Sequence, residues 1–170
     1  MRQVTSAGVN KMLKALEDEK AYLLSMEEEA SVYVLAEEEQ AEAPSYNYEE
    51  TQEKIDAIDK KVRMIKHALN QFNTTTVLEG VGITIDEALV EMAQLNRKKG
   101  KLDGMRKRLP KSRKKEEFYR SSNLIEYEYV NYDIQNVQND YQKVSDRITE
   151  LQIALDFCNQ TKEFTIPIEE

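Results

Sequence analysis

The sequence predicts a mainly α-helical protein, an antiparallel bundle of long helices with coiled-coil-like packing and short β segments near residues 74–85 and 125–131. Only 5 glycines and 3 prolines interrupt the 170 residues, and a third of the residues are charged, a composition typical of long solvated helices. Apolar residues recur at alternating spacings of three and four in two long stretches. We therefore expect one domain, residues 1–170, with helices at about 6–42, 48–73, 85–109 and 133–160.

The first expected helix begins near Thr5 or Ser6, because either hydroxyl can accept a hydrogen bond from a free N–H of the first turn. Lys20 interrupts its apolar stripe, and Pro44 cannot continue the helix beyond residue 43. The residues expected to face inward recur at helical spacing: Val9, Leu13, Leu16, Leu23, Ala30 and Val34.

The second expected helix has a regular apolar seam that predicts close packing on another helix. Its members alternate in steps of three and four: Ile55, Ile58, Val62, Ile65, Leu69 and Phe72. The β-branched run that follows is interrupted at Gly80 and Gly82, which predicts two short extended segments joined by a turn.

The third expected helix begins with a capping box, because Thr84 and Glu87 can satisfy each other's backbone N–H groups. Gly100 and Gly104 weaken this helix, and Pro110 marks its end. The residues expected to face inward are Leu89, Met92, Leu95, Leu102 and Met105.

A basic loop is expected over residues 106–123, followed by a strand in which Tyr127 and Tyr129 alternate with glutamates. Asp133 can cap the last helix, and residues 165–168 are expected to form an extended tail. The last helix has the longest apolar seam: Ile134, Val137, Tyr141, Val144, Ile148, Leu151, Leu155 and Cys158.

Charge is unevenly distributed, since residues 1–50 contain 12 acidic and 4 basic side chains whereas residues 97–115 contain 11 basic side chains against Asp103 alone. This basic segment has two interpretations: it docks on acidic helices of the same or another copy, or it binds nucleic acid. The net charge of −8 favours the first. The candidate contacts for an acidic partner or polyanion are Arg97, Lys98, Lys101, Arg106, Lys107, Arg108, Lys111, Arg113, Lys114 and Lys115.

Three stretches, residues 70–89, 126–134 and 145–161, resemble in order and spacing the septicolysin-like proteins, small and largely uncharacterised bacterial proteins. The resemblance covers roughly residues 65–165. It implies a helical, self-associating bacterial protein, and the family name suggests a membrane-active cytolysin. It implies no catalytic residues.

No constellation of side chains in the sequence suggests catalysis, a metal or a cofactor, and we expect no enzyme activity. His67 is the sole histidine and is expected at the surface, whereas Cys158 ends an apolar seam and is expected to be a buried, unreactive thiol. The glutamates of residues 27–29 point in different directions around a helix and do not converge on an ion.

The function favoured by these patterns is that of a cytoplasmic, homo-oligomeric helical scaffold or interaction protein. A single cysteine fits a reducing compartment, and neither a signal peptide nor a spanning helix is expected. The alternative is a nucleic-acid-associated protein using residues 97–115. The cytolysin suggested by the family resemblance ranks third.

Overall fold

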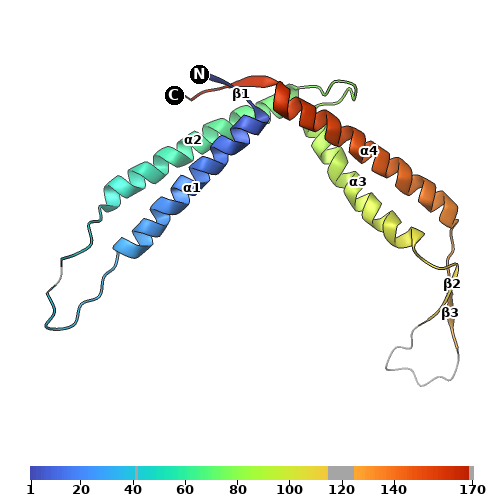
Figure 1. Cartoon of the computed structure of the whole chain (residues 1–170), viewed down its shortest axis with the longest axis horizontal. Coiled ribbons are helices and arrows are strands. Elements are labelled where there is room, and N and C mark those ends of the chain that lie inside the picture. The colour runs from blue at the N-terminus through green and yellow to red at the C-terminus, as the bar shows by residue number, and fades with distance from the viewer. Residues whose placement is uncertain (41, 115–124, 169–170) are drawn as a thin grey trace. The chain divides into compact units, whose positions relative to one another are not determined.

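The structure, a computed structural model, describes residues 1–40, 42–114 and 125–168. Figure 1 shows four long helices and short strands, which confirms the predicted mainly α-helical fold with short β segments. The chain divides into two compact units: Met1–Thr76 with Asp156–Glu170 (unit 1), and Val77–Leu155 (unit 2). No change in composition marks this division, and from the sequence alone the chain was interpreted as one domain.

Unit 1 is a helical hairpin of α1 (Ser6–Ala30) and α2 (Tyr48–Thr75), with β1 (Arg2–Thr5) and β4 (Glu163–Ile166) beside it. Thr5 caps α1 as predicted, because its Oγ1 accepts the N–H of Gly8 at 3.2 Å. The core is concentrated near the strands and consists of Val4, Val9, Leu13, Ile65 and Ile166.

The two strands of unit 1 bring the chain ends together in an antiparallel pair, with Arg2 opposite Ile166 and Thr5 opposite Glu163. Phe164 of β4 stacks on Phe72 of α2, with ring centroids 4.3 Å apart. The expected extended tail is therefore a strand. Its partner β1 was not predicted.

Lys20, which interrupts the apolar stripe of α1, has a partner on α2. Its Nζ lies 2.8 and 2.7 Å from the two carboxylate oxygens of Asp59. Further along the same seam, Glu27 accepts hydrogen bonds from Tyr46 and Gln52. Glu27 therefore faces α2.

The predicted first helix, residues 6–42, is too long, because α1 ends at Ala30 and residues 31–47 form no helix where they are described. By the register of Lys20 with Asp59, the first residue of α2 lies level with Ser31. A helix continued past that point would have no partner on which to bury its apolar face. Residues 32–34, Val-Tyr-Val, also have low helix propensity. Val34, expected inward, is 88% exposed.

Between α2 and α3, Val77 forms an isolated antiparallel bridge with Thr84, so the predicted pair of short extended segments is present. Thr74 and Thr75 belong instead to α2. Gly80 and Gly82 both have φ of +79°, a left-handed conformation that side chains with a Cβ rarely adopt.

We expect Gly82→Ala to destabilise the protein by about 1–2 kcal/mol, because a Cβ there meets open space and only the backbone conformation is penalised. Gly100→Ala, which also meets open space but lies inside α3, is expected to stabilise by about 0.5–1 kcal/mol. Urea unfolding should show that the free energy of unfolding falls for Gly82→Ala and rises for Gly100→Ala. Changes of the same sign would contradict the assigned turn.

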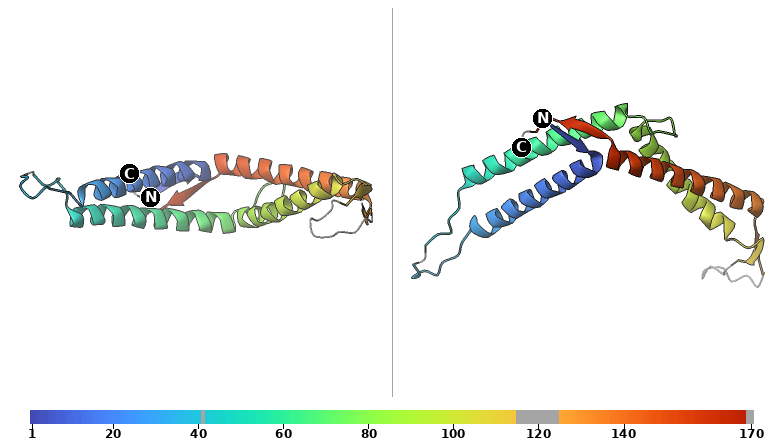
Figure 2. Two further views of the ribbon diagram at one scale, coloured as in Figure 1. Left: turned by 90° about the horizontal axis from the view of Figure 1, so that it is seen from below. Right: turned by 45° about the horizontal axis from the view of Figure 1, so that its top comes forward.

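Unit 2 contains α3 (Ile85–Arg106), β2 (Lys111–Arg113), β3 (Tyr127–Tyr129) and most of α4 (Ile134–Thr161). Figure 2 shows α3 beside α4, and α1 beside α2, in two further views. The predicted capping box is present at Thr84 and Glu87, and Asp133 Oδ1 accepts the N–H of Gln135 at 2.7 Å. The core of this unit consists of Leu102, Val137, Val144 and Ile148, with Leu95, Met105, Tyr132 and Tyr141 packed against it.

Two expectations about α3 were wrong. The helix ends at Arg106 and not at residue 109, because Leu109 precedes Pro110 and that position disfavours helix. Leu89, expected inward, is 47% exposed, whereas its neighbour Ala88 is fully buried. The inward seam includes Ile85, Ala88, Met92, Leu95 and Leu102, and continues through Lys99 and Arg106.

The predicted basic loop, residues 106–123, also contains an unpredicted strand. Lys111–Arg113 forms β2 and pairs antiparallel with β3, which lies within the predicted strand at 125–131. The Pro110 carbonyl accepts the N–H of Val130 at 3.1 Å and extends this two-stranded ribbon. Residues 115–124, including the candidate contact Lys115, lie outside the described part of the chain.

Candidate interaction surfaces

The basic segment is not one continuous surface, because several of its cations have contacts inside unit 2. Arg106 lies over the Tyr141 ring at 4.1 Å, and Lys99 lies over the same ring at 5.6 Å. Arg106 also binds Asp103 and donates to Gln138. These two cations occupy inward positions of the α3 seam, where the electron-rich face of Tyr141 accommodates their charge.

Two further cations pair with carboxylates. Lys107 binds Asp103, and the pKa of Asp103 lies below its ordinary value because Lys107 and then Arg106 hydrogen-bond to its charged form. Lys114 lies 3.0 Å from Glu126. In the described part of the chain, no ion pair is found for Arg97, Lys98, Lys101 or Arg108, and all four are exposed.

The β2–β3 ribbon gathers cations and tyrosines on one face. Its register places Lys111 opposite Tyr129 and Arg113 opposite Tyr127, and directly opposed residues project from the same face. The Lys111 Nζ lies 4.2 Å from the centre of the Tyr127 ring and 5.4 Å from that of Tyr129. Tyr127 is 48% exposed and Tyr129 is 66% exposed. We call these four residues the ribbon face.

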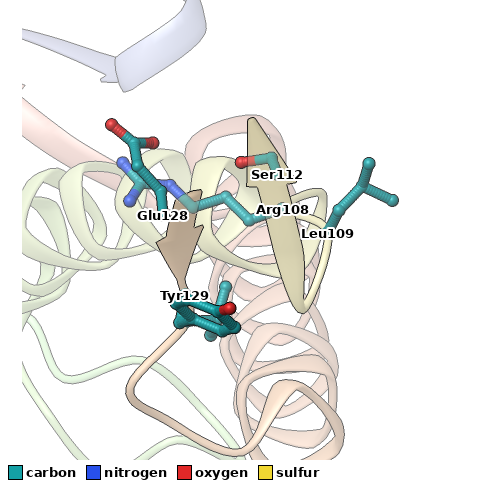
Figure 3. A pocket seen from close by; sticks show the side chains of 6 residues that line it. Arg108, Leu109, Ser112, Glu128 and Tyr129 are labelled. Carbon is teal, nitrogen blue, oxygen red and sulfur yellow. The ribbon is translucent and has the colours of Figure 1, made fainter. Parts of the chain in front are cut away.

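A shallow pocket of about 260 Å³ lies beside the ribbon and is lined by Arg108, Leu109, Ser112, Glu128, Tyr129 and Val130. Figure 3 shows these side chains around the two strands. Ser112 and Glu128 are opposed in the register and alternate with the ribbon face. The pocket therefore offers both a carboxylate, Glu128, and a cation, Arg108, which suits a peptide better than an unbroken polyanion.

The open end of the α1–α2 hairpin in unit 1 is a second candidate. A hollow of about 340 Å³ is lined by residues that include Tyr22, Met26 and Ala30 of α1, Tyr46 before α2, and Thr51 of α2. Tyr46 donates its hydroxyl proton to Glu27 at 2.5 Å, and this hydrogen bond raises the pKa of Tyr46 to about 12. The Tyr46 hydroxyl therefore stays protonated, and keeps donating to Glu27, at a higher pH than an ordinary tyrosine.

Beyond α1, residues 32–39 present apolar and acidic side chains to solvent. Val32 is 73% exposed, Tyr33 is 52% exposed and Val34 is 88% exposed. Glu37, Glu38 and Glu39 follow directly and are exposed, and Glu39 accepts the N–H of Ala36. We call residues 32–39 the acidic arm. The sequence did not predict the acidic arm, because Val34 of the arm continues the apolar periodicity of the first helix and was counted toward a longer helix.

Large apolar side chains are also exposed on the helices. Leu89 and Val90 of α3 are 47% and 53% exposed, and Ile153 and Phe157 of α4 are 66% and 57% exposed. Ile153 and Phe157 are four residues apart and therefore neighbours on one helix face. The seam of α4 points the other way, as predicted, with Val137, Val144, Ile148, Leu151, Leu155 and Cys158 buried.

His67 is exposed and Cys158 is buried, as predicted. Among the residues that the structure describes, no three His, Cys, Asp or Glu side chains are grouped so that they could hold a metal ion. In the same residues, none of the helices combines the length and the apolar character needed to cross a membrane.

We expect the Cys158 thiol of the native protein to react about 100-fold more slowly with an aromatic disulfide reagent than in guanidinium, because labelling requires local opening of a 3%-exposed side chain. A Ser25→Cys substitution in a Cys158→Ala background places a thiol on an exposed position of α1 and should react fast. Native labelling of Cys158 at the rate of that control would identify an accessible thiol.

The backbone is similar to the crystal structure of a functionally unknown conserved protein from Corynebacterium diphtheriae, with a TM-score of 0.64 over 96% of this chain and 100% of that one. The two sequences are 14% identical, so the likeness shows the fold alone. No family model and no curated protein matches the chain. The resemblance to septicolysin-like proteins therefore stays a prediction.

Proposed function

We propose that the protein is a non-catalytic, cytoplasmic interaction protein that assembles with copies of itself. The observation that carries this proposal is the exposed apolar run of residues 32–35, in which Val34 is 88% and Val32 is 73% exposed. Contiguous apolar side chains that are exposed to water belong more often to an interaction site than to a surface that stays free. The septicolysin-like resemblance, which implies self-association, agrees with this proposal.

The helices α3 and α4 place apolar residues on faces that the core does not use. The Ile153–Phe157 pair lies opposite the α4 seam, and Leu89 with Val90 lies outside the α3 seam. A helix pair with a single seam buries little area, and a second copy could cover these further faces. Homo-oligomerisation thus accounts both for the exposed apolar residues 32–35 and for the exposed apolar residues of α3 and α4.

Light scattering over a range of protein concentrations tests the proposal. We expect a mass that is an integer multiple of the 170-residue chain at micromolar concentration, falling on dilution. Because apolar burial is not screened by ions, an increase in salt should leave part of the association intact. A monomer at every concentration and salt would refute self-association.

The second candidate function is binding of single-stranded nucleic acid, and the ribbon face favours it. Exposed Tyr127 and Tyr129 next to Lys111 and Arg113 resemble the combination of stacking rings and cations that such proteins use. Against it, Glu126 and Glu128 lie on the same ribbon, and the chain has a net charge of −8. Binding of a labelled oligonucleotide at about 150 mM salt, abolished by Tyr127→Ala with Tyr129→Ala, would favour this alternative.

A further inference from the structure

The acidic arm and the ribbon face have complementary compositions. Residues 31–47 contain four glutamates and no basic residue, whereas residues 106–114 contain six basic residues and no acidic one. The arm places its apolar residues 32–35 directly before Glu37, Glu38 and Glu39. The ribbon face places tyrosine rings directly beside cations.

We propose that the acidic arm of one copy docks on the ribbon face of a second copy. Val32 and Val34, which project from the same face of an extended segment, would cover the exposed rings of Tyr127 and Tyr129, and the glutamates would approach Lys111, Arg113 and Arg108. The proposal rests on the proposed function, self-association, and names the surfaces that perform it.

The geometry of the arm suits this contact. Residues 32–35 are not helical and belong to the β-branched and aromatic types that favour extended backbone. Among the residues that the structure describes, each strand of this two-stranded ribbon has one edge without a strand partner, and an extended segment can pair with such an edge. The contact would thus combine backbone hydrogen bonds with apolar burial and charge pairing.

The arm explains the ribbon face better than a nucleic acid does. A nucleic acid would neutralise the cations but leave the aliphatic side chains of residues 32–35 in water. Docking of the arm covers two exposed surfaces in one contact.

Charge reversal of each surface tests the proposal. The arm variant carries Glu37→Lys, Glu38→Lys and Glu39→Lys, and the ribbon variant carries Lys111→Glu and Arg113→Glu. Each alone is expected to weaken self-association at least about tenfold, because like charges then face each other. A Lys98→Glu, Lys101→Glu variant, altered on the exposed face of α3, should associate as the wild type does.

Mixing the arm variant with the ribbon variant is the decisive measurement. Each chain then offers the other a complementary pair of surfaces, so association should return in the mixture, as measured by light scattering. One chain carrying both sets of changes should also self-associate. If that doubly changed chain and both single variants stay monomeric, and mixing restores nothing, the proposed contact between copies is wrong.

The remaining outcomes separate this inference from the proposed function. A wild type that associates, together with reversal variants of unchanged mass, overturns the docking of the arm and leaves self-association intact. A monomeric wild type overturns both. A ribbon variant that keeps its mass but loses oligonucleotide binding overturns the inference in favour of nucleic acid. Far-ultraviolet circular dichroism of every variant establishes that its helices are formed.

Discussion

Replacing Ile148 with aspartate is expected to destabilise unit 2 by about 4 kcal/mol or more, whereas the same replacement at Ile153 should change the stability of the monomer, measured at high dilution, by less than about 0.5 kcal/mol. Both isoleucines lie on α4. Ile148 is 5% exposed within the core of unit 2, and Ile153 is 66% exposed on the opposite face. Both variants replace isoleucine with aspartate within the same helix, so the change in helix propensity is nearly the same. The expected difference in stability therefore comes from the burial of an unpaired carboxylate at position 148.

Unit 1 offers an equivalent pair. Ile65 is fully buried in the core of unit 1, and Ile65→Asp should destabilise that unit as strongly. Ala57→Asp alters an exposed position of the same helix and serves as the control. Hydrogen exchange followed by mass spectrometry assigns each loss of protection to its unit. Wild-type stability of both Ile148→Asp and Ile65→Asp would refute the assigned seams.

The helices were predictable from the sequence where an apolar seam runs without interruption. The seams of α2 and α4 alternate in steps of three and four, and each was found to face inward over its whole length. The seam of α3 was assigned incorrectly at Leu89, because Lys99 and Arg106 occupy two of its inward positions. A pattern that counts apolar residues cannot identify a seam position whose cation lies over a tyrosine ring.

The strands were predictable only in part, because their pairing is not local. β1 consists of four residues, and its partner β4 lies at the other end of the chain. No turn joins the two strands, so no local signal predicts the pair. β2 consists of Lys111, Ser112 and Arg113, residues that do not favour strands, and it is set by its pairing with the tyrosines of β3.

The candidate surfaces, too, were predictable from the sequence only in part. The basic segment was visible as a cluster of charge, but its separation into inward cations, ion pairs and a ribbon face depends on tertiary contacts. The acidic arm was hidden, because the end of α1 is set mainly by the length of its partner α2, and the low helix propensity of residues 32–34 adds to this effect. A helix that loses its partner at Ser31 leaves the next apolar residues exposed.

An ion-pair cluster links α3 and α4. Arg147 donates from Nε to Glu91 Oε1 at 2.8 Å and from Nη2 to Glu91 Oε2 at 3.0 Å, while Nη1 donates to Glu150 at 2.9 Å. The hydrogen bonds from Arg147 lower the pKa of Glu91 below its ordinary value, and those carboxylates raise the pKa of Arg147. Arg147 therefore stays charged at every pH used in unfolding experiments.

We expect Arg147→Met to destabilise the protein by about 1–2 kcal/mol at pH 7, a value reduced from that of a buried pair because both side chains are 31% exposed. A lowered folded-state pKa of Glu91 means that its stabilising contribution is complete above the unfolded-state value of 4.5 and is lost as the pH falls through the folded-state value. The difference between wild type and variant should therefore shrink as the pH falls from about 5 to about 3.

Urea unfolding at several pH values measures this difference, with Arg97→Met as the control because Arg97 lies exposed on α3. The control should stay within about 0.5 kcal/mol of the wild type throughout. A constant difference for Arg147→Met down to pH 3 would mean that Arg147 stabilises unit 2 by interactions other than its ion pair with Glu91. A difference that vanishes with acid would assign the stabilisation to the Glu91 carboxylate, the group whose protonation breaks the bidentate pair.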